Sequence, residues 1–161
     1  MKIAAGIVFA IALATDLTYP EGASALTVRK TIDVSASPDR VWAAIGDFCG
    51  IAKWHPLVAS CAQHSKDGRK FRDIAFKDGG KVEEQIYDWN DEGHYYTYIV
   101  IETTLPVAHY TSTVAVMPKG GGSTILWTGR FEAKGEPDAK VVEEISALYE
   151  SGLDLLKSEL H

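Results

Sequence analysis

A run of strand-like segments followed by one long helical segment is the feature that most limits how this chain can fold. From Leu57 to Phe131 the sequence reads as strands of about ten residues, as in an antiparallel sheet. Tight-turn signals separate the strands, at KDG (66–68), KDGG (77–80), NDEG (90–93) and KGGG (119–122). The pattern predicts an antiparallel meander of about six strands.

The period becomes helical after GEPDA, in a segment that runs roughly from Pro137 to Leu160. Its apolar residues form one stripe, which consists of Val141, Ile145, Leu148, Gly152, Leu155 and Leu156. One helix cannot bury such a stripe alone, and the only large apolar partner is the concave face of the sheet. A curved sheet that grips a helix leaves a space between them.

The segment before the meander adds one strand and short helices. LTVRKTIDV alternates from Leu26 to Val34 and predicts a half-buried strand, in which Lys30 interrupts the apolar side. In SASPDRVWAAIGDF, Ser37 can cap a helix and Pro38 suits its first turn. The predicted order is therefore a strand, short helices, antiparallel strands and a long C-terminal helix, which is the α+β class.

The first 25 residues have the pattern of a secretory signal peptide. Lys2 precedes an apolar run over 3–14 that is shorter than the ~20 residues needed to span a bilayer, and residues 23–25 are small, as cleavage requires. An uncleaved anchor is the alternative interpretation. We expect residues 26–161 to form one domain, periplasmic or secreted, monomeric and without a membrane span after cleavage. Because the formal net charge is −6, nucleic acid is an improbable partner.

Four segments resemble the SRPBCC superfamily, and more narrowly its polyketide cyclase/dehydrase-like branch. They are VWAAIGDFCGIAKWHPLV, DGGKVEEQIYDWN, LPVAHYTSTVAV, and TGRFEAKGEP with the later YESGLDLLK. The resemblance covers essentially the whole chain after residue 25. It implies a helix-grip fold, in which a seven-stranded antiparallel sheet wraps around the C-terminal helix and encloses an apolar cavity. The resemblance specifies the function less well than the fold, because proteins with this fold include transporters, hormone receptors and cyclases.

Strand parity predicts which side chains face that cavity, independently of the resemblance. Arg72 shares a face with Ile74 and Phe76, and Glu84 shares one with Ile86. Because a lone buried charge is very costly, Arg72 and Glu84 should form an ion pair between neighbouring strands. The pair can be purely structural, can anchor a ligand, or can take part in acid–base catalysis.

The resemblance implies roles for three residues. Lachrymatory-factor-synthase-like enzymes use an arginine, a glutamate and a tyrosine in the cavity, and Arg72, Glu84 and Tyr110 occupy comparable places. Arg72 would stabilise an oxyanion or carbonyl, Glu84 would accept and donate a proton, and Tyr110 would donate a hydrogen bond. For the strand that begins near Tyr95, the inward face stays open. The residues expected to contact a ligand are Trp54, His55, Arg72, Ile74, Phe76, Glu84, Ile86, Tyr98, Tyr110, Trp127, Leu148 and Gly152.

Two cysteines enclose the stretch CGIAKWHPLVASC. The spacing of Cys49, His55, Cys61 and His64 does not match a structural zinc site, and no C-x-x-C or supporting base indicates a reactive thiol, so we expect no metal and no cofactor. Export favours a Cys49–Cys61 disulfide, worth ~3 kcal/mol in the loop-entropy model, and two free thiols are the alternative. We expect His55 either to form hydrogen bonds within the turn or to face the pocket. Trp54 is large enough to fill one end of the cavity.

Three classes of function remain open. The first is an exported protein that binds a small apolar or amphipathic molecule, as apolar walls with a few polar groups favour. The second is a cyclase- or isomerase-type enzyme that uses Arg72, Glu84 and Tyr110. The third is an accessory protein that acts through a periplasmic protein partner, since some exported relatives resemble accessory proteins of methanol oxidation and an acidic domain can dock a cationic partner.

Overall fold

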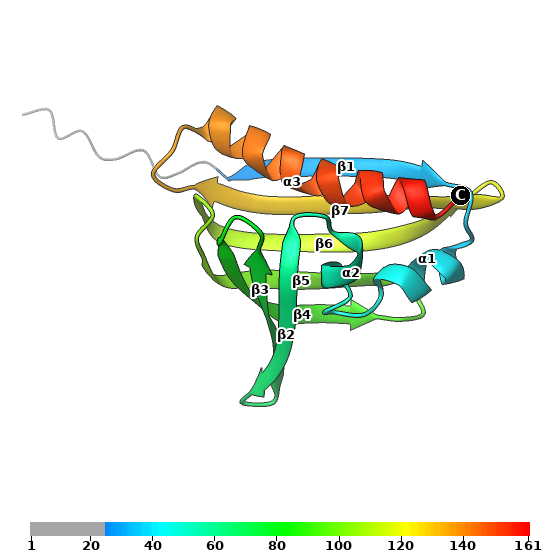
Figure 1. Ribbon diagram of the computed structural model, residues 1–161, viewed down its shortest axis with the longest axis horizontal. Coiled ribbons are helices and arrows are strands. Elements are labelled where there is room, and N and C mark those ends of the chain that lie inside the picture. Colours follow the sequence, from blue (N-terminus) through cyan, green and yellow to red (C-terminus); the bar gives the residue numbers. More distant parts are fainter. Residues whose placement is uncertain (1–24) are drawn as a thin grey trace, which may run out of the picture.

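A computed structural model of the chain describes residues 25–161, so the expected signal peptide lies almost wholly outside the described residues (Figure 1). The strands are β1 (Leu26–Val34), β2 (Val58–Lys66), β3 (Arg69–Phe76), β4 (Lys81–Asn90), β5 (Tyr95–Thr103), β6 (Val107–Lys119) and β7 (Gly122–Ala133). The helices are α1 (Pro38–Ile45), α2 (Ile51–Trp54) and α3 (Asp138–Glu159).

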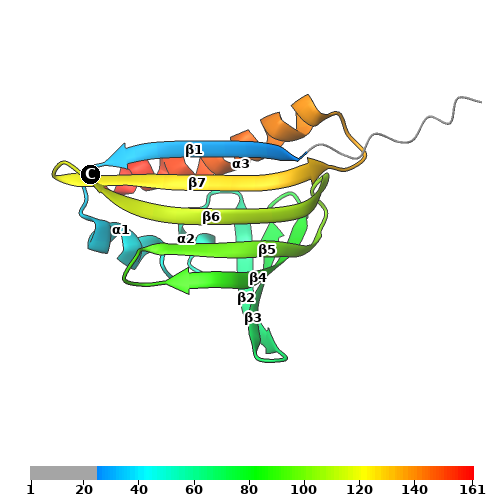
Figure 2. The same cartoon turned by 180° about the vertical axis from the view of Figure 1, so that it is seen from behind.

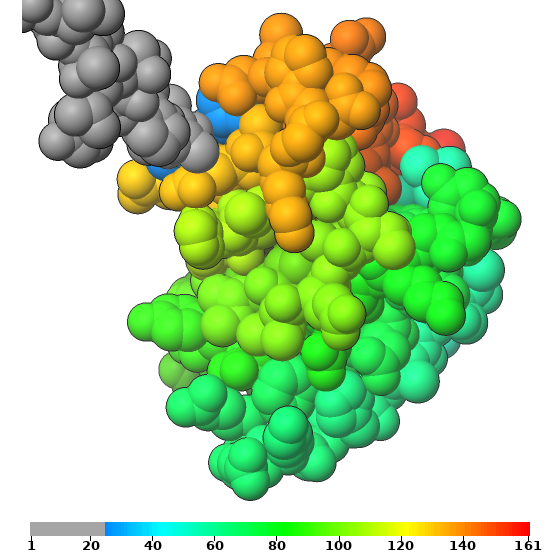
Figure 3. Space-filling model, turned by 90° about the vertical axis from the view of Figure 1, so that its left-hand side faces the viewer, coloured from blue at the N-terminus to red at the C-terminus, as the bar shows by residue number. Residues whose placement is uncertain are grey.

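The strands form one antiparallel sheet in the order β1-β7-β6-β5-β4-β3-β2. The three helices lie on one face of this sheet, with α3 along β1 and β7 and with α2 in front of the middle strands (Figures 1 and 2). The space-filling view shows α3, in orange, at one end of the molecule and the blue-green hairpin of β2 and β3 at the other end (Figure 3). The predicted α+β fold with a seven-stranded sheet, two short helices and a long C-terminal helix is confirmed.

Local sequence chemistry accounts for the ends of these elements. Ser37 caps α1 by accepting a hydrogen bond from the Arg40 backbone N–H at 3.4 Å. Asp67 and Gly68 both adopt positive φ, which gives the tight turn between β2 and β3 the twist that a two-residue hairpin requires. Within residues 25–161, no helix combines the length and apolar character needed to cross a membrane.

The buried stripe of α3 is displaced from the predicted one. The residues of α3 that are buried are Val141, Ile145, Tyr149, Gly152, Leu153 and Leu156. Leu148 and Leu155, which were assigned to the stripe, are only half-buried at its flank. The buried stripe passes from Ile145 to Tyr149, four residues on, and then to Gly152, three residues further. A tyrosine therefore occupies the centre of the contact with the sheet.

Two irregularities in the β4–β5 pairing also shift the expected faces. The register changes between Glu83 and Glu84 and again between Ile86 and Asp88. The extra residue is Ile101 of β5 in the first case and Tyr87 of β4 in the second, so the alternation of β4 is interrupted only after Ile86. On β5 the open question is resolved, since Tyr96 and Tyr98 are buried and Tyr95 is half-buried.

Candidate functional site

A small cavity lies between the sheet, α2 and α3. Its lining includes eight residues predicted to contact a ligand, namely His55, Ile74, Phe76, Glu84, Tyr98, Tyr110, Trp127 and Leu148. Three further lining residues were not predicted, namely Ile51, Val82 and Leu105. The cavity has a volume of about 20 Å³, which is room for about one water molecule.

Four residues predicted to contact a ligand do not line this cavity. Trp54 and Gly152 are buried where α2 meets α3. Arg72 lies behind Glu84 and is fully buried. Ile86 is half-buried, packs against the core and lines a separate hollow with Phe48 and Trp89.

Arg72 and Glu84 form the predicted ion pair. They are directly opposite in the β3–β4 register, and Arg72 Nε donates to Glu84 Oε2 at 2.5 Å. The guanidinium also donates to the Phe48 carbonyl oxygen through Nη1, and its carbon lies 4.2 Å from the centroid of the Phe48 ring and 5.1 Å from that of Tyr98. Nη2 is buried without a partner among the described residues. Arg72 is thus held inside an aromatic cage, and only its partner Glu84 reaches the cavity.

Burial and pairing act in opposite directions on Glu84. Desolvation raises the pKa of its carboxyl group, and the attraction of Arg72 offsets part of this rise. For Arg72, burial alone would lower the pKa, but Glu84 together with Tyr96 and Tyr98 raises it, so the guanidinium stays charged. The cavity therefore contains a carboxylate that is more basic than an ordinary glutamate.

A chain of hydroxyl groups forms the opposite side of the site. Tyr110 and Tyr149 are joined through their hydroxyls at 2.5 Å, and Tyr149 lies 3.0 Å from Ser112 Oγ. Ser112 donates its own proton to the Thr128 carbonyl at 2.8 Å, so it accepts from Tyr149 and also from Trp127 Nε1 at 3.0 Å. These bonds give the tyrosines fixed positions.

The tyrosines of the site are hydrogen-bond donors. Burial, as the largest cause, raises the pKa of Tyr98, Tyr110 and Tyr149 far above the usual value, so all three keep their protons. The oxygen of Tyr98 accepts from Trp127 Nε1 at 3.2 Å, which leaves the phenol's own O–H as a donor toward the cavity that it lines.

Tyr149 was missed in the sequence, although one signal points to it. A Cβ atom at Gly129 would lie 2.1 Å from the Tyr149 hydroxyl, so this tyrosine occupies the space that the glycine leaves on β7. A glycine on an otherwise apolar strand face indicates close approach of another group. The sequence offers this glycine and a tyrosine four residues after Ile145 as a signal, but only the structure shows that the two meet.

His55 joins α2 to α3. Its Nδ1 accepts the Leu57 backbone N–H at 3.3 Å, and its Nε2 donates to the Leu148 carbonyl at 3.0 Å. Burial lowers the pKa of His55, with the positive charge of Arg72 as a smaller cause, so the ring is neutral with its proton on Nε2. Both roles considered for His55 are present in the geometry, since it bonds the turn and lines the cavity.

The disulfide Cys49–Cys61 is present, with the two Cα atoms 5.4 Å apart. It ties the segment between α1 and α2 to β2, so the start of α2 is anchored covalently to the edge of the sheet. The site thus consists of apolar walls with one carboxylate acceptor and one free phenol donor, that of Tyr98, a set suited to the polar end of a mostly apolar molecule.

Comparisons with known proteins agree with this architecture. The family model described as "Polyketide cyclase / dehydrase and lipid transport" matches residues 25–161. The solved structure of the protein XoxI from Bacillus cereus is similar, with a TM-score of 0.77 and 27% identity over 83% of this chain and 94% of that chain. An uncharacterised protein from Bacillus thuringiensis gives a TM-score of 0.76 and 26% identity over 84% and 98%.

A more distant likeness supports the fold alone. The Zhui aromatase/cyclase from Streptomyces sp. R1128 gives a TM-score of 0.70 and 17% identity over 85% of this chain and 94% of that chain. The comparison with curated proteins gave no match.

Proposed function

The chain belongs to the polyketide cyclase/dehydrase and lipid transport family, and we propose that it binds a small amphipathic molecule in the cavity between the sheet and α3. The observation that carries the proposal is the pairing of a carboxylate, Glu84, with the free O–H of Tyr98 in a cavity whose other walls are largely apolar. A hydroxyl group on the ligand fits this pair, because it donates to Glu84 and accepts from Tyr98. The rest of the ligand is apolar.

Binding requires the site to open. Sites for drug-sized molecules measure ~300 Å³ or more, whereas this cavity measures about 20 Å³. The wall opposite the sheet is formed by Ile51 and His55 of the α2 region and by Leu148 of α3, and the hydrogen bond from His55 to the Leu148 carbonyl joins the two. Ligand entry therefore involves displacement of α2 from α3.

A matched pair of ligands tests the recognition of a hydroxyl group. The fluorescence of 2-naphthol and naphthalene would be titrated with the protein, and 2-naphthol should bind more tightly. Tyr98→Phe should weaken the binding of 2-naphthol by about 2- to 10-fold, the effect of one hydrogen bond, and should leave naphthalene unchanged. Tyr87→Phe is the control, since Tyr87 is 71% exposed on β4. Equal binding of both compounds would contradict the assigned polar anchor.

Native mass spectrometry of protein purified from its own host tests binding more generally. A co-purifying apolar or amphipathic molecule that is lost on unfolding is the expected result. If no ligand co-purifies and neither aromatic compound binds, the cavity is not a binding site and the proposal is wrong.

A second candidate is catalysis of proton transfer, and the raised pKa of Glu84 favours it. In this scheme Glu84 takes a proton from the carbon next to a ligand carbonyl, Tyr98 donates to the carbonyl oxygen, and Arg72 positions Glu84. The predicted donor, Tyr110, would first have to release its bond to Tyr149. Exchange of the corresponding protons of 2-tetralone with D₂O, followed by NMR, would measure the step. Glu84→Gln should slow it by about 100-fold or more while the protein stays folded. Equal rates in both proteins would exclude this role.

We also propose that the protein is exported, which the apolar run before residue 25 and the Cys49–Cys61 disulfide support. N-terminal sequencing of protein from the periplasm or medium should begin at or near Leu26. A sequence that begins at Met1 would contradict cleavage.

A further inference from the structure

The outer face of the sheet, away from the helices, carries carboxylates opposite one another on three neighbouring strands. Asp73 of β3 is directly opposite Glu83 of β4, and Glu83 is directly opposite Glu102 of β5. Like charges in directly opposite positions repel each other and destabilise the sheet. Among residues 25–161, the only ion pairs of Asp73 and Glu83 are those with His64 of β2. Lys81 lines a surface hollow together with these carboxylates but forms no ion pair with the row among these residues, so the negative charge of the row is only partly balanced.

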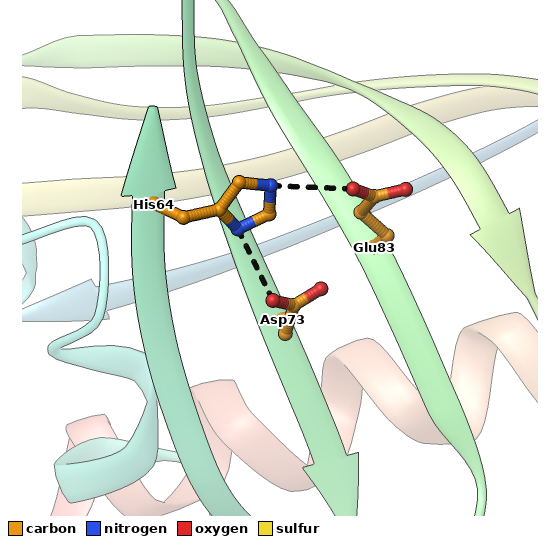
Figure 4. Close-up of side chains that lie close together, drawn as sticks. All are labelled: His64, Asp73 and Glu83. Atoms are coloured by element: carbon orange, nitrogen blue, oxygen red, sulfur yellow. Dashed lines mark ion pairs between the residues drawn. The ribbon is translucent and has the colours of Figure 1, made fainter. Parts of the chain in front are cut away.

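His64 lies between two of these carboxylates (Figure 4). Its Nδ1 is 3.1 Å from Asp73 Oδ2, and its Nε2 is 3.4 Å from Glu83 Oε1. A neutral imidazole has one proton, so only one nitrogen can donate to a carboxylate. With that proton on the closer Asp73 side, the lone pair of Nε2 faces a carboxylate oxygen. That contact is repulsive unless a second ring proton or a metal ion lies between the two atoms.

The ring is held in this orientation and is open to solvent. His64 stacks on Phe71, with ring centroids 5.1 Å apart and planes at 6°, and Phe71 is buried. The side chains of His64, Asp73 and Glu83 are 39%, 59% and 29% exposed. An ion from solution can therefore reach the three groups without any opening of the fold.

We propose that His64, Glu83 and Asp73 bind a divalent transition-metal ion of the zinc class. One ligand atom from each residue can be chosen so that all lie within 4.8 Å of one another. The 3.4 Å between His64 Nε2 and Glu83 Oε1 is about the separation of two ligands on a tetrahedral ion with bonds of about 2.1 Å. Without the ion, Asp73 Oδ2 lies 3.1 Å from Nδ1 and accepts its proton; as the third ligand it would leave Nδ1–H and turn to the ion.

The donor set also indicates which ions are excluded. One imidazole nitrogen with carboxylate oxygens suits zinc and similar ions, whereas calcium and magnesium prefer oxygen ligands alone. Asp73 and Glu83 line the surface hollow of about 570 Å³ together with Glu102 and Lys81, which leaves space for water beside these two carboxylates. The site is separate from the cavity and does not depend on the proposed function.

Isothermal titration of the mature protein without added histidines tests the site. We expect one Zn²⁺ to bind per chain, with Ca²⁺ and Mg²⁺ giving no heat under the same conditions. His64→Ala should weaken Zn²⁺ binding by at least about 10-fold. His109→Ala is the matched control and should have no effect, because His109 Nδ1 meets a single carboxylate, Glu132, at 3.0 Å.

Unfolding without metal separates a metal site from a simple ion pair. Asp73→Asn and Glu83→Gln should leave the melting temperature of the metal-free protein unchanged or higher, because each removes like-charge repulsion, and both should abolish the increase that Zn²⁺ produces in the wild type. If Zn²⁺ binds equally to wild type and His64→Ala, or does not bind the wild type at millimolar concentration, the proposal is wrong.

Discussion

Arg72 is a fully buried cation whose charge is met by Glu84, by the Phe48 carbonyl and by aromatic faces. Neither member of the pair is stable in this place without the other, because an unpaired charge in a low-dielectric interior has no compensation. The pair could be predicted because strand parity put both charges on an apolar face. Its position behind the cavity could not, because the cage depends on where Phe48 and Tyr98 point.

Mutation of the pair should therefore be strongly non-additive. Arg72→Met or Glu84→Leu alone should lower the free energy of unfolding by ~3–5 kcal/mol, because each leaves a buried charge unpaired. The double variant should lose much less, since apolar side chains of similar volume can replace a buried pair almost neutrally. Urea unfolding of the wild type, both single variants and the double variant measures the coupling. Additive losses would show that the two charges do not stabilise each other.

Protonation of His55 should destabilise the fold below neutral pH. Because burial lowers the folded-state pKa, the unfolded chain takes up a proton first as the pH falls through about 6.5, and stability decreases from that point downward. His55→Gln removes this titration and should make the loss between pH 7 and pH 5 smaller. His109→Gln is the control, since the His109 side chain is 80% exposed. Melting curves with the same pH slope in wild type and His55→Gln would contradict the assignment.

At the scale of elements, the contact between α2 and α3 depends on a glycine. The strands, the turns and the limits of α3 could be predicted, because alternation, glycine turns and helical period are local properties of the sequence. The centre of the α3 stripe could not, because the choice between Leu148 and Tyr149 depends on the niche at Gly129 across the core. The irregular pairing between β4 and β5 likewise depends on both strands and not on local sequence.

Gly152→Ala tests the contact between the helices. In an exposed helix this change stabilises by about 0.8–1 kcal/mol. Here a Cβ would lie 2.7 Å from His55 Cδ2 and 3.1 Å from Trp54 Cζ3, and overpacking of a core costs ~1–3 kcal/mol, so a net loss of stability is expected. Ser151→Ala, the neighbouring position on α3, should not destabilise. A gain in stability for Gly152→Ala in urea unfolding would mean that α2 moves away from α3 at little cost.

At the scale of the whole molecule, the fold is a sheet closed by helices, with the movable side of the cavity tied to the sheet edge by Cys49–Cys61. Sequence could suggest this bond but not establish it, because the distance between two Cα atoms depends on the path of α2. The small cavity volume was also beyond the sequence, because side-chain packing determines how much space a curved sheet leaves. We therefore expect the same bond to affect both stability and the opening of the cavity that the proposed function requires.

Removal of the disulfide should loosen one side of the molecule more than the other. Cys49→Ser with Cys61→Ser should lower the free energy of unfolding by ~2–4 kcal/mol, because the unfolded chain regains the freedom of the loop. Beyond this global loss, backbone amides of residues 49–58 should show the largest increase in hydrogen exchange, since α2 loses its covalent anchor, while β6 and β7 should show only the global effect. If all protected amides accelerate by the same factor, the disulfide acts only through the unfolded state and does not restrain the opening of the cavity.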